Sequence, residues 1–212
     1  MILVFDIKSS RQASLSKACS LQEWLAPGVL YWRLTDFYDD PATVKKSGEK
    51  LRRASRVVLD LRDNPGGLLT EAVRTASVFL DRGVVCTVSG LHQEETVYEV
   101  SGGAEFPRLP VTVLVNGGSA SAAEIVAAAL ADNERAVIVG KRTYGKASVQ
   151  SIRPLSAGRA LKLTTATYLT PSGTDLAGRG IRPSVKVDND PLTVRDEMIR
   201  AAERVLAGQF AA

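Results

Sequence analysis

The chain has 212 residues, which is long enough for one substantial domain with its own hydrophobic core and leaves room for a second small one. Hydrophobic residues make up 45%, and no run approaches the roughly 18 uninterrupted apolar residues that a membrane span needs. The net charge of +4 is spread along the chain without long basic clusters, so nothing in it indicates nucleic acid or anionic lipid as a partner.

Residues 1–27 are predicted to form an N-terminal arm. They contain a short apolar strand over residues 2–7 and an amphipathic piece around Trp24, and Pro27-Gly28 marks a boundary. The short apolar run has no basic segment before it, so we do not expect a secretory signal here. The two cysteines, Cys19 and Cys86, can form at most one bridge, and the sequence leaves their pairing open.

Residues 28–190 are predicted to form the core, because short runs of Val, Ile and Leu alternate with helical periodicity, as in α/β proteins. The elements expected in chain order are a strand at 29–34, a helix at 41–53, a strand at 57–61, a helix at 68–80, a hairpin of 84–88 and 96–100 with a polar connection from Gly90 to Glu95, a strand-turn-helix-strand-loop unit within 111–150, and strands at 160–168 and 185–187. A helix from about Leu192 to Leu206 makes residues 191–212 a separate C-terminal segment.

The strongest candidate chemistry lies where the strand-turn-helix unit reads Gly117-Gly-Ser-Ala-Ser121. Ser121 begins a capping box that ends at Glu124, and Ser119 is also a good N-cap, so either hydroxyl can instead serve only to bind helix amides. The small residues around the turn favour a nucleophile, because they let a substrate backbone approach closely, and a cap does not require this.

A serine nucleophile needs a base, and a lysine can take its proton only when the lysine is neutral, a form that burial away from water favours. Lys146 lies between Gly145 and Ala147 after an apolar strand, which makes it the lysine best placed for burial. A solvated loop position is the alternative for Lys146, and Lys141 and Lys162 are alternative bases.

Two other chemistries find less support. His92 is the sole histidine and falls in the polar hairpin connection, so a multi-histidine metal site is excluded and a Ser-His-Asp triad is disfavoured. Residues 140–146 fit the glycine and lysine spacing of a phosphate-binding P-loop, a distant alternative function. However, Ala147 has no hydroxyl for magnesium, and residues 148–154 are strand-like where a P-loop continues into a helix.

Five blocks of the chain, in order, carry a family resemblance. They are residues 59–67 (LDLRDNPGG), 115–125 (VNGGSASAAEI), 132–133 (DN), 139–150 (VGKRTYGKASVQ), and 168–173 with 180–183 (YLTPSG and GIRP). In these blocks the chain resembles the carboxyl-terminal processing peptidases, or tail-specific proteases, which are serine-lysine endopeptidases. The resemblance covers about Gly28 to Val187. It implies a crotonase-like mixed α/β protease core with an added strand-rich C-terminal segment, which cleaves protein substrates near their C-termini without a metal or cofactor.

The resemblance implies a catalytic role for three residues. The nucleophile falls on Ser121, the second serine of the Ser-Ala-Ser run, and the general base falls on Lys146. Gln150 matches the glutamine that orients the lysine. Residues four apart in an ideal strand are separated by roughly 13 Å, so a contact between Lys146 and Gln150 requires the intervening segment to bend.

The resemblance also implies residues that support the reaction. The amides of Gly67 and Ala122 are expected to form the oxyanion hole, so the first glycine turn and the serine helix would each supply one donor. Glu124 and Asp132 match acidic family positions and are expected to support the site without performing chemistry.

The chain departs from the family pattern at its N-terminus. Family members usually carry a PDZ domain that captures substrate C-termini by strand addition, and the 27 residues before Gly28 are too few for one. We therefore expect a truncated or domain-deleted version, with an extracytoplasmic location, in the periplasm or cell envelope, implied by the family. A non-catalytic module that binds a peptide or apolar ligand on the same fold is the alternative function.

Overall fold

The computed structural model describes residues 2–6, 20–37, 48–90, 93–100, 102–156, 159–189 and 196–208. The elements are, in chain order, β1 (Ile2–Asp6), β2 (Ser20–Ala26), β3 (Val29–Leu34), β4 (Arg56–Asp60), α3 (Leu69–Phe79), β5 (Val84–Gly90), β6 (Gln93–Glu99), β7 (Val111–Val115), α4 (Ala122–Asp132), β8 (Ala136–Gly140), β9 (Ser148–Pro154), β10 (Arg159–Leu169), β11 (Val185–Lys186) and α5 (Glu197–Gly208). Residues 48–53 are also helical.

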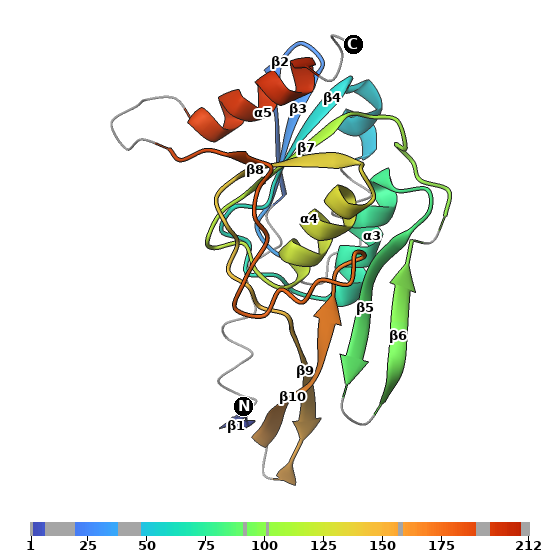
Figure 1. Cartoon of the computed structure of the whole chain (residues 1–212), viewed down its shortest axis with the longest axis vertical. Helices are drawn as coiled ribbons and strands as arrows, with labels where there is room; N and C mark the ends of the chain where they lie inside the picture. The colour runs from blue at the N-terminus through green and yellow to red at the C-terminus, as the bar shows by residue number, and fades with distance from the viewer. Residues whose placement is uncertain are drawn as a thin grey trace.

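The strands form two sheets, and α3 and α4 lie between them (Figure 1). One sheet has six strands in the order β11-β8-β7-β4-β3-β2, all parallel except the edge strand β2. The other has five antiparallel strands in the order β1-β10-β5-β6, with β9 also paired to β10. The chain is therefore a mixed α/β protein, which confirms the predicted fold class.

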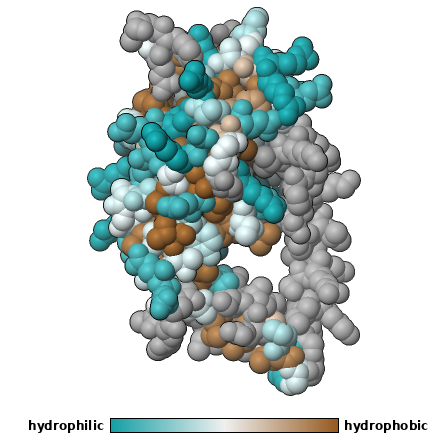
Figure 2. Space-filling model, turned by 90° about the vertical axis from the view of Figure 1, so that its right-hand side faces the viewer, coloured by the Kyte–Doolittle hydropathy of each residue, from teal (hydrophilic) through white to brown (hydrophobic). Residues whose placement is uncertain are grey.

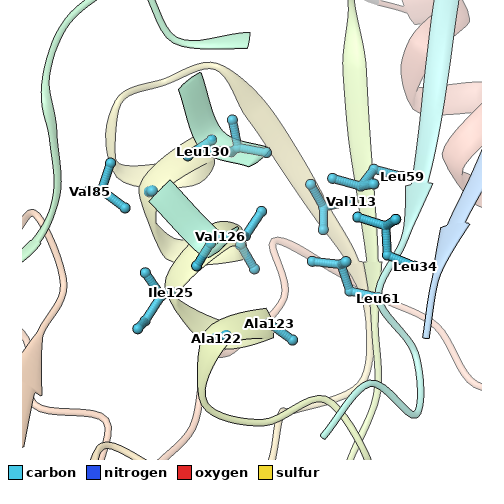
Figure 3. Packing of buried hydrophobic residues seen from close by; sticks show 14 of the residues in the cluster. Leu34, Leu59, Leu61, Val85, Val113, Ala122, Ala123, Ile125, Val126 and Leu130 are labelled. Carbon is cyan, nitrogen blue, oxygen red and sulfur yellow. The ribbon is translucent and has the colours of Figure 1, made fainter. Parts of the chain in front are cut away.

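The central strands of the six-stranded sheet are covered on both faces. Val57, Leu59 and Val113 point toward α4, whereas the intervening Val58 and Leu114 point toward α5 on the opposite face. Figure 3 shows Leu59 and Val113 facing residues of α4. Because α4 is rich in alanine, it can pack close against the sheet, and this places its N-terminal end next to the turns that follow β4 and β7.

The five-stranded sheet is more exposed. Its edge strand β6 carries the exposed residues Glu94, Glu95 and Glu99, and Val97 is 51% exposed. Figure 2, which views the molecule from the side of β5 and β6, shows hydrophilic and hydrophobic residues mixed on this face. Charged side chains on an edge strand disfavour pairing with another chain, so this arrangement protects the open edge.

Two predicted boundaries are wrong. The polar connection predicted from Gly90 to Glu95 is shorter, because β5 reaches Gly90 and β6 already begins at Gln93; His92 lies outside the described residues. The C-terminal helix, predicted from about Leu192, does not yet include Asp196, and α5 begins at Glu197. The carboxylate of Asp196 accepts hydrogen bonds from the amides of Met198 and Ile199, so Asp196 acts as the helix cap.

The segments of the predicted arm contribute strands to both sheets. β2 pairs with β3 across the predicted boundary at Gly28, and β1 pairs with β10. The division into arm, core and C-terminal segment stays a prediction. Cys86 has a free thiol, and burial raises its pKa to about 12; Cys19 lies outside the described residues. No helix in the described ranges is long and apolar enough to cross a membrane.

Candidate active site

A pocket of about 320 Å³ opens beside the N-terminal end of α4, between the turn that precedes α3 and the strands β9 and β10. The three residues expected to be catalytic and the two expected to form the oxyanion hole all line it: Ser121, Lys146, Gln150, Gly67 and Ala122. These residues come from three separate segments of the chain. The fold thus brings together residues that lie up to about eighty positions apart in the sequence.

Ser121 has an unusual backbone conformation. Its φ is 54° and its ψ is −117°, at the position directly before the first residue of α4. An ordinary N-cap has extended dihedrals, and a non-glycine residue in this region costs on the order of 1–3 kcal/mol. This strain marks Ser121 as a candidate functional residue, whereas its amide binds Glu124 as in a capping box.

Ser119, the other candidate serine, is fully buried, and its hydroxyl is hydrogen-bonded to the protein. Its hydroxyl donates to the carbonyl of Leu61 at 2.7 Å and accepts a hydrogen bond from the amide of Asn116 at 3.0 Å. Both partners lie in the two glycine turns, so Ser119 ties one turn to the other. Because its hydroxyl has no access to a substrate, Ser121 is the better candidate for the nucleophile.

The two glycine turns pack tightly. A Cβ atom on Gly66 would lie 2.7 Å from Cβ of Ser121 and 2.9 Å from the amide nitrogen of Ala122. Asp63, with φ of 58°, donates its amide to the side chain of Asn116 and accepts the side-chain amide of Asn116 in return. Sequence reasoning missed this reciprocal pair, because the partners are 53 positions apart.

The amides of Gly67 and Ala122 fit the expected oxyanion hole. Both residues line the pocket, and in the described part of the chain neither amide donates to a protein acceptor. Ala122 opens α4, and the first amides of a helix have no partner within it and carry its positive dipole end. Two unoccupied donors from different turns can therefore stabilise negative charge on an oxygen bound between them.

Glu124 links the serine turn to the lysine loop. Its side chain is fully buried, and one oxygen, Oε2, accepts the amides of both Ser121 and Lys146 at 2.9 Å. The other oxygen, Oε1, accepts the amide of Gly145 at 2.7 Å and the hydroxyl of Thr143 at 2.5 Å. A single buried carboxylate thus fixes the backbone of both proposed catalytic residues. Thr143 was not predicted as a site residue.

Tyr168 makes a second link of the same kind. Its hydroxyl donates to the carbonyl of Lys146 at 2.5 Å and lies 3.3 Å from the carbonyl of Ser121. Burial, followed by the negative charge of Glu124, raises the pKa of Tyr168, so the phenol keeps its proton. Tyr168 lies in one of the blocks that carried the family resemblance, yet nothing in its sequence surroundings indicated this contact.

Lys146 is half-buried at the pocket, and no ion pair among the described residues includes it. Gln150 lies in β9 and lines the same pocket. Its partner strand β10 has an irregularity between Thr164 and Ala166, opposite Gln150. A bend that brings Lys146 into contact with Gln150 stays a prediction.

The alternative bases fit less well. Lys141 is exposed and forms an ion pair with Asp188, outside the pocket. The side chain of Lys162 lies outside what the structure describes. Asp132, expected to support the site, lies at the far end of α4, where it accepts the amide of Ser172 and lines a different pocket. It therefore connects α4 to the turn after β10 and does not face Ser121.

The geometry disfavours a P-loop. The loop that contains Lys146 leads into β9, not into a helix. Its amides at Gly145 and Lys146 already bind the carboxylate of Glu124, so they are not free to bind phosphate.

Comparison with known proteins gives a consistent result. The model of peptidase family S41 matches residues 28–187. A carboxy-terminal-processing protease of Bartonella bacilliformis is 44% identical over 155 residues, which cover 72% of this chain and 36% of that protein. Carboxyl-terminal-processing peptidase 2 of Arabidopsis thaliana, a chloroplastic protein, is 39% identical over 162 residues, which cover 74% of this chain and 32% of that protein.

Solved structures agree with the sequence relatives. A photosystem II D1 C-terminal processing protease matches with a TM-score of 0.70 and 30% identity, over 95% of this chain and 52% of that one. A lipoprotein from Streptococcus agalactiae, at 16% identity and a TM-score of 0.79, shares the fold over 99% of this chain and 76% of its own. The chain spans about a third of the length of the curated relatives that it matches. The match over residues 28–187 and the identity to these relatives show that the chain belongs to peptidase family S41.

Proposed function

We propose that the chain is the catalytic core of a serine endopeptidase that cleaves protein substrates near their C-termini with a Ser121-Lys146 dyad. The observation that carries this proposal is the strained backbone of Ser121 at the mouth of α4, beside the pocket that Lys146 also lines. Strain of this kind persists where the surrounding structure enforces it, and it is concentrated at functional sites. Family membership supports the peptidase class, and the names of the relatives support substrate C-termini as targets.

The proposed reaction balances its protons through Lys146. Neutral Lys146 takes the proton of Ser121 as the hydroxyl oxygen attacks the substrate carbonyl, and the amides of Gly67 and Ala122 bind the resulting oxyanion. Lys146 then gives the proton to the leaving amine as the C–N bond breaks. A water molecule then attacks the acyl carbonyl as Lys146 takes its proton, and Lys146 returns this proton to the oxygen of Ser121 as the ester bond breaks, which releases the carboxylic acid and restores both residues. Gln150, which lines the pocket beside Lys146, would orient the amine.

The location of the protein is proposed on the same basis. Its relatives include a chloroplastic processing peptidase and bacterial processing proteases. We therefore propose that the protein acts outside the cytosol, with protein C-termini as its partners.

Fluorophosphonate labelling tests the nucleophile. The probe should attach to Ser121 by peptide mass mapping, and Ser121→Ala and Lys146→Met should each abolish labelling and peptide cleavage. Ser148→Ala is the matched control, since Ser148 lines the same pocket and has no role in the mechanism, so it should keep both. Mapping of the label to another serine would refute the assignment.

A binding module on the same fold is the competing function. It predicts that wild type and Ser121→Ala bind a peptide equally and that neither releases a product. Calorimetry combined with mass spectrometry of the incubated peptide separates the two functions, because a peptidase yields new termini near the peptide's C-terminal end.

A further inference from the structure

A buried charge network lies at the carboxyl end of β4. The side chain of Asp60 is 0% exposed and that of Arg62 is 11% exposed. Arg62 donates from Nε to Oδ1 of Asp60 at 2.9 Å and from one terminal nitrogen to Oδ2 at 2.6 Å. Tyr31 donates its hydroxyl to the same Oδ2 at 2.6 Å. This face of the guanidinium is therefore held within the six-stranded sheet.

The other end of Arg62 contacts the C-terminal helix. Its second terminal nitrogen donates to Oδ2 of Asp196 at 2.6 Å. Asp196 uses its other oxygen, Oδ1, to accept the amides of Met198 and Ile199, which starts α5. Asp196 therefore caps the helix with one oxygen and binds Arg62 with the other. It lies beyond residue 187, where the match to the family model ends.

Arg62 also opens the turn that supplies one oxyanion donor. The residue before it, Leu61, accepts the hydroxyl of Ser119 through its carbonyl. Two residues after it, Asn64 accepts the amide of Ala120 through its carbonyl and the amide of Gly66 through its side chain. Residues 61–67 contain no helix or strand element. At its end the turn is held by a bridge between Phe37 and Gly67, and at its start by these contacts and the Arg62 network.

We propose that Asp196 is a positioning residue for the oxyanion hole: by holding Arg62, it keeps the 61–67 turn in the course that aims the amide of Gly67 into the pocket. The C-terminal helix thereby takes part in stabilising the transition state, although it contributes no group to the pocket. The catalytic consequence rests on the proposed peptidase function, whereas the effect on the turn does not.

Asp196→Asn is the test variant. Asparagine keeps a capping oxygen for Met198 and Ile199 but loses the charge opposite Arg62. We expect kcat on a peptide substrate to fall about ten- to a hundredfold with KM changed less than about twofold, because a displaced donor acts on the transition state and not on substrate binding. Hydrogen exchange of the amides at residues 62–68 should become faster, while exchange within α5 should stay as in wild type.

Asp188→Asn is the matched control. Asp188 lines the same polar hollow as Arg62 and Asp196, but it pairs with the exposed Lys141. Its loss should leave kcat and the exchange of residues 62–68 unchanged.

Hydrogen exchange tests the role of Asp196 independently of peptidase activity. If wild type shows no peptidase activity, the peptidase proposal fails, and faster exchange at residues 62–68 still supports the role of Asp196. Unchanged exchange there overturns that role, as does faster exchange confined to α5, which would show a capping role alone. If Asp196→Asn does not fold, Asp196→Ser replaces it in the same measurements, since serine also caps a helix without a charge.

Discussion

The turn that carries Ser121 and the loop that carries Lys146 are built in different ways. The serine turn is held both by its own neighbours and by the first glycine turn: the amide of Ser121 binds Glu124, three positions away, whereas the hydroxyl of Ser119 donates to the carbonyl of Leu61, 58 positions away. Its strained φ of 54° follows from a sharp passage between β7 and α4. The position of the proposed nucleophile thus depends on its own turn and on the 61–67 turn that packs against it.

The lysine loop depends on distant contacts. Glu124 binds the amides of Gly145 and Lys146 from more than twenty positions away, and Tyr168 binds the carbonyl of Lys146. Gly145 packs so closely that a Cβ atom on it would lie 2.8 Å from the amide nitrogen of Gly180. Both positions therefore depend on long-range contacts, but through different partners: the first glycine turn holds the serine, whereas Glu124 and Tyr168 hold the lysine. The predictions below test this difference, in order of the expected change in the free energy of unfolding.

Gly66→Ala should have the largest effect, because it breaks the contact between the two glycine turns. Gly66 has φ of +103°, and a Cβ atom would come within 2.9 Å of backbone atoms of Ala120 and Ala122. We expect a loss of about 3 kcal/mol or more in urea unfolding, together with loss of activity. Gly173→Ala is the control, since Gly173 also has positive φ but has nothing within 4 Å of the added atom. Equal losses for both variants would contradict the proposed tight packing.

Glu124→Gln should affect both the serine turn and the lysine loop, because Glu124 binds the amides of Ser121 and Lys146. Glutamine keeps one acceptor, its carbonyl oxygen, but its NH2 group cannot accept a hydrogen bond, so two of the four donors that Glu124 now binds would be left unpaired. We expect a loss of about 2 kcal/mol in stability and at least about a tenfold fall in kcat. A variant with wild-type stability and kcat would show that the carboxylate does not position the dyad.

Tyr168→Phe should mainly affect the loop that carries Lys146. Removal of the hydroxyl frees the carbonyl of Lys146, and we expect a loss of about 1 kcal/mol and a several-fold fall in kcat. Tyr144→Phe is the control, because Tyr144 lies on the loop before Lys146 and its residue surface is 67% exposed. This variant should leave stability unchanged. Thermal unfolding and steady-state kinetics on both variants measure the difference.

Ser121→Gly should stabilise the protein while it abolishes activity. Glycine adopts the backbone conformation of Ser121 without strain, so we expect a gain of about 1 kcal/mol in the free energy of unfolding. Ser121→Ala keeps the strained backbone and should show no such gain. If both variants unfold at the same denaturant concentration, the backbone conformation of Ser121 does not reduce the free energy of unfolding.

The smallest expected effect is on the pH dependence of the free energy of unfolding. Burial alone would raise the pKa of Asp196, but the hydrogen bond from Arg62 and the amide of Ile199 lower it below its usual value. A lowered folded-state pKa contributes stability that is present above the unfolded pKa and is lost as the pH falls through the folded value. Asp196→Asn should therefore lose less stability than wild type in urea unfolding as the pH falls from about 5 to below the folded-state pKa of Asp196. Asp60, Arg62 and Tyr31 face the same network and are retained in both proteins.

The sequence by itself determined the elements whose cause is local. Short continuous runs of apolar residues predicted β4 and β7, glycine pairs predicted the turns after them, and Ser121 with Glu124 predicted the capping box that starts α4. These patterns act over a few residues, so each segment favours its own structure. The family blocks added the expected site residues, whose roles stay proposals.

Only the tertiary structure decided how the segments meet. It showed Glu124 bound to Lys146, Tyr168 bound to the same residue, and Asp63 paired with Asn116, none of which a local pattern encodes. It also placed Asp132 away from the pocket. The physical reason is that buried polar groups must find partners wherever the packed chain brings them, and those partners come from distant segments whose approach no short stretch of sequence determines.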